Sequence, residues 1–250
     1  MRGAQRILLK TSADVAAIRA SCRLAAEVLR TVGEWVVPGV STRELDLLAL
    51  QRIRQQGAEP AVDARFPGSI CISVNDVAAH GVPCGYRLEE GDAVTVDVAV
   101  RLGGWCGDAA GTFAAGRASE RITGLLGCAR RALQAGLAAA RAGLRLGDLG
   151  AAIQREAAGG GCTVLAELVG HGIGASLHED PEVPPCGLPG EGLPIVPGMV
   201  FTLEPALCWG EGRLETGKDG WSLRTVDRSP VAQFEHTIAV FRDRTEVLTL

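Results

Sequence analysis

The sequence contains few aromatic residues and almost no lysine. Aromatic side chains make up 4% of the 250 residues, with a single tyrosine, and lysine occurs only at Lys10 and Lys218. The formal net charge is −4 and no block of basic residues occurs, so the chain has no general electrostatic attraction to nucleic acid or to acidic membrane surfaces. We therefore expect no specific nucleic-acid partner and no membrane association.

Long apolar runs and paired cysteines are also missing. No stretch approaches the roughly 20 apolar residues that span a bilayer, and the first ten residues lack the apolar core of a secretory signal. The eight cysteines include no C-x-x-C pair, which argues against a zinc knuckle or a redox pair. These absences predict a cytoplasmic protein whose cysteines are mostly small core residues.

What is present is sufficient for a substantial core, since 47% of the residues are hydrophobic and 22% are charged. Such a chain is typical of one or two globular domains. Apolar residues follow helical spacing after Thr11, and this first helix should end before Pro38. Ser41 and Glu44 form a capping box for a second helix that closes at Gly57.

The helical pattern returns in the second half of the chain, from about residue 119 to residue 140 and in a shorter helix to residue 158. A shift of 104 residues aligns the segment around Gly39 with the segment around Gly143, glycine on glycine, aliphatic on aliphatic and acid on acid. In each half, two helices precede strands. The repeat predicts a pseudo-symmetric α+β domain whose site lies between the halves.

A predicted hairpin carries the first two functional candidates. Valines alternate with other residues over 94–101, which indicates a strand, and Gly103-Gly104 offers a two-residue turn. With that turn Ala99 faces Asp108, and Asp97 lies one diagonal step away on the same face. Two buried like charges weaken a fold, so this pair favours a metal or a shared proton over the alternative of a solvated surface pair.

The second half of the chain supplies further candidates of the same kind. His171 lies among glycines that let a backbone approach a ligand, Glu204 ends an apolar strand before a proline, and Glu235 lies near the start of another. Each feature alone is also typical of a turn, a strand end or a core histidine. Arg101 is the only basic residue on these strands, so nearby arginines cannot pair all four carboxylates. Four carboxylates and one imidazole suit two divalent cations.

At this point the sequence resembles the type I methionine aminopeptidases of the pita-bread fold over nearly its whole length. That resemblance implies an α+β protein of pseudo-two-fold halves, with a curved antiparallel sheet covered by helices. It also implies a single catalytic metallopeptidase domain, residues 1–250, with halves at about 11–113 and 118–250. The motifs that carry it are Ser73–Pro83, Asp97 with Asp108, Gly170–Glu179, Phe201–Pro205, Asp219–Ser222 and Gln233–Thr237.

The resemblance implies a dinuclear hydrolase that removes the initiator methionine from peptides and nascent proteins with a small second residue. Asp97 would chelate one divalent ion, His171 and Glu204 the other, and Asp108 and Glu235 would bridge both. Manganese, iron, cobalt and zinc all accept this ligand set. The expected cofactors are therefore two divalent ions of one or more of these four metals.

The same resemblance implies how the reaction proceeds. Water activated by the metals attacks the carbonyl after methionine, and Glu204 relays a proton towards the leaving amine. His178 would stabilise the developing oxyanion, and His80 would contact the scissile peptide. His236 is interpreted as a structural neighbour of Glu235.

The expected methionine pocket matches the family only in part. Phe66, Cys71 and Trp221 fit, but Leu177 stands where phenylalanine is usual and Asp63 lies near the place of an aromatic residue. We therefore expect a preference for methionine that is weaker than in close family members.

The surroundings of the metal ligands also depart from the family pattern. Ala99 stands where a threonine is usual, and Ala109 and Ala110 stand where a hydroxyl residue is usual. Hydrogen bonds to the ligands would then be missing, which predicts lower metal affinity. A monomer is expected, and transient contact with the ribosome is left open because no ribosome-binding appendage is evident.

Two other functions remain open from the sequence. A proline-directed peptidase or creatinase-like relative would carry the same five ligands, although such relatives generally have a separate N-terminal domain. A binding protein without catalytic activity on this fold would be marked by loss of ligands, and all five are present.

Overall fold

The computed structural model describes residues 6–250, which form four α-helices and fifteen β-strands. The helices are α1 (Ser12–Gly33), α2 (Thr42–Gln55), α3 (Glu120–Ala139) and α4 (Leu146–Gly159). The first strands are β1 (Glu59–Pro60), β2 (Cys71–Val74), β3 (Val77–Ala79), β4 (Ala93–Leu102), β5 (Trp105–Ala114), β6 (Thr163–Val164), β7 (Gly170–Gly172) and β8 (Glu179–Val183). The remaining strands are β9 (Val200–Leu203), β10 (Ala206–Cys208), β11 (Leu214–Thr216), β12 (Leu223–Thr225), β13 (Val231–Gln233), β14 (His236–Val240) and β15 (Thr245–Val247).

The helices begin where their capping residues predict. The hydroxyl of Thr11 accepts from the backbone N–H of Asp14 at the start of α1, and Ser41 with Glu44 forms the capping box of α2. The N-cap of α3 is Ser119, whose side chain accepts from Ile122. The predicted helix starts are confirmed, because these side chains satisfy backbone donors that the helix itself leaves unpaired.

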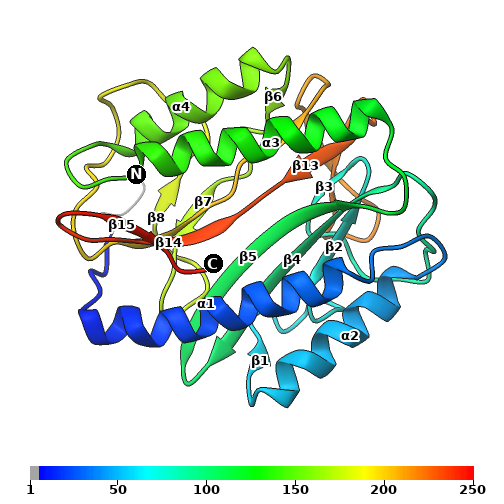
Figure 1. The fold of residues 1–250 in the computed structure, drawn as a ribbon, viewed down its shortest axis with the longest axis horizontal. Coiled ribbons are helices and arrows are strands. Elements are labelled where there is room, and N and C mark those ends of the chain that lie inside the picture. The colour runs from blue at the N-terminus through cyan, green and yellow to red at the C-terminus, as the bar shows by residue number, and fades with distance from the viewer. Residues whose placement is uncertain (1–5) are drawn as a thin grey trace.

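The helix pairs repeat with the predicted shift of 104 residues. α2 and α4 each contain 14 residues, and both their first and last positions are 104 apart. The turns before them hold Gly39 at φ 91° and Gly143 at φ 92°, a backbone conformation that glycine adopts without strain. Figure 1 shows α1 with α2 along one side of the central strands and α3 with α4 along the other. The pseudo-two-fold α+β fold is confirmed, whereas the division at 11–113 and 118–250 stays a prediction.

The central hairpin has the predicted register. β4 and β5 pair antiparallel with Ala99 opposite Asp108, and Gly103 and Gly104 form the turn with φ of 58° and 85°. The valines of β4 at positions 94, 96, 98 and 100 are fully buried against α1 and α2. This packing commits one face of the strand to the core, so Asp97 lies on the other face.

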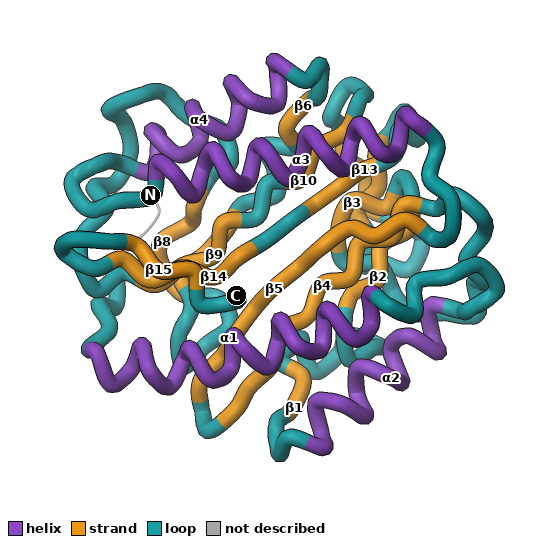
Figure 2. The backbone as a smooth tube through the Cα atoms, in the orientation of Figure 1, coloured by secondary structure: helices purple, strands orange, loops and turns teal. Residues whose placement is uncertain are grey.

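All strand pairs are antiparallel, but the strands are divided among four short sheets. β9 and β14 pair with Leu203 opposite His236, and β10 and β13 pair with Ala206 opposite Gln233. Between these two strand pairs the pairing is interrupted, but the register is the same on both sides. Glu204 and Glu235 therefore lie opposite one another in this interruption. Figure 2 shows the loop-coloured stretch between β13 and β14. The sequence predicted that Glu235 lies inside a strand that begins at residue 234. In the structure, Glu235 directly precedes β14.

Each half has its own apolar core. One cluster joins α1 and α2 to β2, β4 and β5, and the other joins α3 and α4 to β9, β10 and β14. Phe201 and Leu125 are among the largest fully buried side chains of the second cluster. Among the described residues, no helix has the length and apolar character needed to cross a membrane.

Candidate metal centre

Three carboxylates from both halves converge where the strand ladders meet. Asp97 lies on β4, Asp108 on β5 and Glu235 between β13 and β14, and one oxygen of each lies within 4.8 Å of the others. The backbone N–H of Glu235 donates to the carbonyl of Ala110 at 2.9 Å. A bridge between Gly111 and Phe234 also joins the two halves here. Backbone pairing across the halves thus brings the three acids together.

His171 and Glu204 complete the set of five expected ligands. The Nε2 atom of His171 lies 3.7 Å from Oδ2 of Asp108 and 3.7 Å from Oε1 of Glu204. Its Nδ1 atom lies 3.0 Å from the carbonyl oxygen of Gly172. Because a carbonyl oxygen only accepts, Nδ1 carries the proton and Nε2 faces the carboxylates with a free lone pair. This orientation is the one a metal-binding imidazole requires.

Burial sets the charge state of these groups. Desolvation raises the pKa of Asp97 to about 6 and the pKa of Glu204 to about 8. Desolvation and the neighbouring carboxylates raise the pKa of Asp108 and of Glu235 well above the usual range. Desolvation lowers the pKa of His171 to about 4, so its ring is neutral at pH 7.

The residues present fit divalent cations. Oδ1 of Asp108 and Oε1 of Glu235 are buried and have no hydrogen-bond partner among the described residues, and buried polar atoms rarely stay unpaired. Within residues 6–250, no lysine or arginine forms an ion pair with any of the four carboxylates. Cations would satisfy the orphan oxygens and balance the buried charge.

Two hydrogen bonds that the sequence did not reveal hold the expected ligand Glu204. Oγ1 of Thr202 donates to Oε1 of Glu204 at 2.7 Å, and Nε2 of Gln233 donates to Oε2 of Glu204 at 3.2 Å. Both residues precede an expected ligand by two positions, so the period-two spacing of a strand could have identified them. Asp108 has no such hydroxyl partner at Oδ1. The expectation of lower metal affinity stays a prediction.

The other histidines lie around the carboxylates at different depths. The rings of His171 and His178 are in edge contact with centroids 4.3 Å apart, and His178 and His80 are exposed. Desolvation is the main cause that lowers the pKa of His80, and the nearby His178 lowers it further. His80 also has φ of 54°, a strained conformation for a residue other than glycine. Nδ1 of His236 lies 2.8 Å from Oγ1 of Thr249, as expected for a structural role.

The expected methionine pocket contains an aromatic pair. The rings of Phe66 and Trp221 meet edge to face with centroids 5.3 Å apart. Cys71 pairs with Asp97 across β2 and β4, so both side chains lie on one face. Asp63 is exposed and pairs with Arg65 at 3.0 Å, so its charge is balanced rather than presented alone at the rim. Leu177 packs on an apolar cluster beneath its loop.

A buried aspartate behind this pocket also escaped prediction. Asp46 on α2 is 8% exposed. Its Oδ1 accepts from the backbone N–H of Ser69 at 2.6 Å and of Ile70 at 3.1 Å, directly before Cys71. These bonds tie α2 to the edge of the expected pocket.

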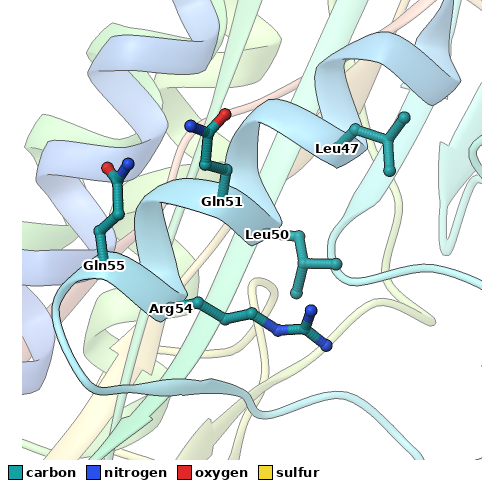
Figure 3. A pocket seen from close by; sticks show the side chains of 5 residues that line it. All are labelled: Leu47, Leu50, Gln51, Arg54 and Gln55. Atoms are coloured by element: carbon teal, nitrogen blue, oxygen red, sulfur yellow. The ribbon is translucent and has the colours of Figure 1, made fainter.

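Two surface cavities differ in their relation to the candidate metal centre. One lies on α2 and is lined by Leu47, Leu50, Gln51, Arg54 and Gln55, all from this helix (Figure 3). The other, of about 410 Å³, lies among residues of α1, α3, β5 and the segment 234–236. It reaches Glu235 from the helix-covered side of the strands.

Metal-free protein should lose stability as the pH rises from 6.5 to 9. Above pH 6.5 free histidines are neutral, whereas the carboxyls with raised pKa must ionise in the buried site. The stabilisation that these protonated carboxyl groups contribute to the folded state is fully present below their pKa in the unfolded chain, near 4.5. It is lost as the pH rises through their pKa in the folded protein, which is about 8 for Glu204. Glu204 alone accounts for about 2 kcal/mol of this loss.

The measurement is the melting temperature against pH with chelator and with saturating Mn²⁺. We expect the metal-free protein to lose at least roughly 5 °C over this interval, and the metal-loaded protein to lose little. A melting temperature of the metal-free protein that stays constant or rises would contradict the buried-carboxylate description.

The fold and these residues define a metallopeptidase, and the chain belongs to metallopeptidase family M24, which it matches over residues 16–241. Relatives with about 40% sequence identity over nearly its whole length include methionine aminopeptidases. That of Salmonella typhimurium is 40% identical over 98% of this chain and 94% of that protein. That of Clostridium perfringens is 39% identical over 98% of this chain and 99% of that protein.

Solved structures agree with the sequence relatives. The crystal structure of methionine aminopeptidase from Rickettsia prowazekii matches with a TM-score of 0.96 at 38% identity, covering 98% of this chain and 100% of that one. The prolidase from Pyrococcus furiosus matches with a TM-score of 0.79 at 21% identity and is covered over 65% of its length. The prolidase shares the fold. The resemblance to methionine aminopeptidases is confirmed.

Proposed function

We propose that this chain is a metal-dependent aminopeptidase that removes the N-terminal methionine from peptides and nascent proteins with a small second residue. The observation that carries the proposal is the convergence of Asp97, Asp108, His171, Glu204 and Glu235, which no cationic side chain among residues 6–250 balances. Phe66 and Trp221, which are expected to contact the methionine side chain, form an aromatic pair. Family membership and the named relatives support the same activity.

Asp97, Asp108, His171, Glu204 and Glu235 would hold the two divalent cations of this proposal. Bound there, such cations supply a water that is acidic near neutral pH and a Lewis acid for the scissile carbonyl. Manganese, iron, cobalt and zinc all remain candidates.

Glu204 is suited to move the proton. In the metal-free protein, burial raises the pKa of its carboxyl group to about 8, and bound cations would lower this pKa. Thr202 and Gln233 hold one oxygen each, which fixes the carboxyl plane. We assign Glu204 the transfer of a proton towards the leaving amine.

His178 and His80 are assigned to the substrate. Desolvation lowers the pKa of His178, so its ring is neutral and can donate one N–H to the developing oxyanion. His80 is exposed on the segment after β3 and would contact the scissile peptide. Cys71 lies opposite Asp97 and would contact the methionine side chain.

The rival activity is cleavage of Xaa-Pro bonds, because prolidases share the fold. Hydrolysis of Met-Ala-Ser, Leu-Ala-Ser and Ala-Pro peptides by metal-reconstituted protein separates the two. We expect the methionine peptide to be cleaved fastest and the proline peptide not at all. Preferential cleavage of the proline peptide would assign the chain to the rival class.

Substituting Leu177 with phenylalanine should sharpen the preference for methionine. A leucine removes a ring that would pack against the thioether, and such sulfur–aromatic contacts contribute about 0.3–1.5 kcal/mol. We expect Leu177→Phe to raise the ratio of kcat/KM for Met-Ala over Leu-Ala peptides by up to roughly tenfold. Leu47→Phe, on the outer face of α2 (Figure 3), is the control. An unchanged ratio in Leu177→Phe would refute the pocket assignment and leave the hydrolase assignment intact.

We further propose that the chain works as a monomer in the cytoplasm on emerging or completed polypeptide N-termini. Transient contact with the ribosome would follow from action on nascent chains. No specific nucleic acid or membrane is part of this proposal.

A further inference from the structure

The loop between β7 and β8 carries two residues of the proposed reaction. It spans residues 173–178 and includes Leu177 and His178. The ring of His178 rests against the ring of His171. The position of His178 therefore depends on what holds this loop.

A buried ion pair holds the end of the loop. Nζ of Lys10 lies 2.5 Å from Oε2 of Glu179, and the two side chains are only 6% and 9% exposed. The other carboxylate oxygen of Glu179 accepts from the backbone N–H of Ser176 at 3.2 Å. Glu179 thus joins the N-terminal segment to the loop on both sides of His178.

The packing around the ion pair is close. A Cβ atom at Gly174 would lie 2.5 Å from Oε1 of Glu179 and 2.7 Å from Nζ of Lys10. Only a residue without a side chain leaves room for the pair at that point. The Gly174 carbonyl accepts from the backbone N–H of Cys106 at 2.8 Å, and Arg101 donates to the carbonyl of Ala175.

Lys10 itself is fixed from the other direction. Its backbone N–H donates to the carbonyl of Gly198 at 2.7 Å, and the N–H of Gly198 donates to the carbonyl of Val240 at 2.8 Å. Thr11, the next residue, caps α1. The ammonium group therefore extends from a backbone anchored to α1 and the strand β14.

A buried ion pair seldom adds net stability, because desolvation offsets the attraction between the charges. Its geometric effect is more specific, since two buried charges tolerate only a narrow range of separations. We propose that Lys10 is a positioning residue that acts through Glu179 to hold His178 where it meets the developing oxyanion. This inference rests on the proposed function and adds to it a residue far from the metal ligands in sequence.

The first test is a double-mutant cycle with Lys10→Met and His178→Ala. Lys10→Met should lower kcat on a Met-Ala peptide by roughly 10–100-fold, the usual effect of a displacement of about 1 Å, with KM within about threefold. In the His178→Ala background the same change should lower kcat by no more than about twofold. Equal losses in both backgrounds, or an unchanged kcat in Lys10→Met, would overturn the proposal.

A matched control and a second variant keep this test independent of stability. Arg131→Met removes a pair of similar length, 2.8 Å to Glu156, whose side chains are 59% and 37% exposed between α3 and α4. We expect it to leave kcat unchanged. Glu179→Gln retains the shape of the side chain and should reproduce the kcat loss if Lys10→Met does not fold.

A readout without turnover separates this inference from the proposed function. Histidine ring NMR signals of the metal-free protein, assigned by replacing each of the four histidines, report ring positions directly. In Lys10→Met or Glu179→Gln the His178 signal should move while that of His236 stays. An unmoved His178 signal overturns the positioning role, whereas failure of the wild type to cleave Met-Ala overturns only the function.

Discussion

Replacing Asp108 with alanine is expected to abolish turnover and binding of both cations. Asp108 is the carboxylate that approaches Asp97 and Glu235 and also lies 3.7 Å from Nε2 of His171. A cation pair provides several kcal/mol of transition-state stabilisation, so kcat should fall by at least roughly 10³-fold. The measurements are metal content by mass spectrometry and hydrolysis of Met-Ala at saturating metal.

The control for this substitution is Asp92→Ala. Asp92 is as buried as Asp108, at 6% against 5% exposed, but its partners are Asn75, Tyr86 and the backbone of Glu89. We expect Asp92→Ala to retain the metal stoichiometry even if it lowers stability. Asp108→Ala should not lower the melting temperature of the metal-free protein, because it removes a buried carboxyl oxygen without a partner. Full activity of Asp108→Ala would contradict the assignment of Asp108 as a metal ligand.

Replacing His178 with alanine should reduce kcat by roughly 10²–10³-fold with little change in KM. The ring is neutral, exposed and in contact with His171, so it is placed to meet charge that develops only during attack. Steady-state kinetics on a Met-Ala peptide over a range of concentrations measures both constants. If only KM changes, His178 binds the substrate and does not stabilise the oxyanion.

His236→Ala is the histidine control for that experiment. Its ring lies 2.8 Å from Thr249 and has no assigned contact with substrate. We expect a change in stability and a kcat within about threefold of the wild type. The contrast separates loss of an oxyanion donor from loss of any imidazole near the carboxylates.

Local sequence patterns predicted the elements that short-range forces determine. The alternation of valines in β4 and the two glycines of the turn fixed the hairpin register, and hence the placement of Asp97 and Asp108 on one face. The capping residues Thr11 and Ser41 marked the helix starts. In these cases the residues that determine the structure are neighbours in the chain.

Features formed by distant residues were not predicted from the sequence. The pair of Lys10 and Glu179 joins positions 169 apart, and a lone lysine gives no local signal of its partner. The break that places Glu204 opposite Glu235 depends on pairing between strands from different parts of the second half. The prediction that all five candidate ligands converge likewise rested on the family resemblance as well as on the pattern of acids on strands.

Leu177 and Asp63 show a further limit of the sequence. The sequence placed Asp63 near the position of an aromatic residue, and in the structure Arg65 pairs with it and lowers the pKa of its carboxyl group to about 2. The two residues are close in sequence, and the pattern D-x-R could have indicated this ion pair. Leu177 packs on an apolar cluster, and its contribution to selectivity stays a prediction.

Anomalous diffraction from cobalt-loaded crystals tests the proposed dinuclear site by locating the cations. We expect two anomalous peaks, roughly 3.5–4 Å apart, each within bonding distance of Asp108 and Glu235. Asp97 should coordinate one peak, and His171 with Glu204 should coordinate the other. Cobalt bound away from these five residues, with none between Asp108 and Glu235, would contradict it.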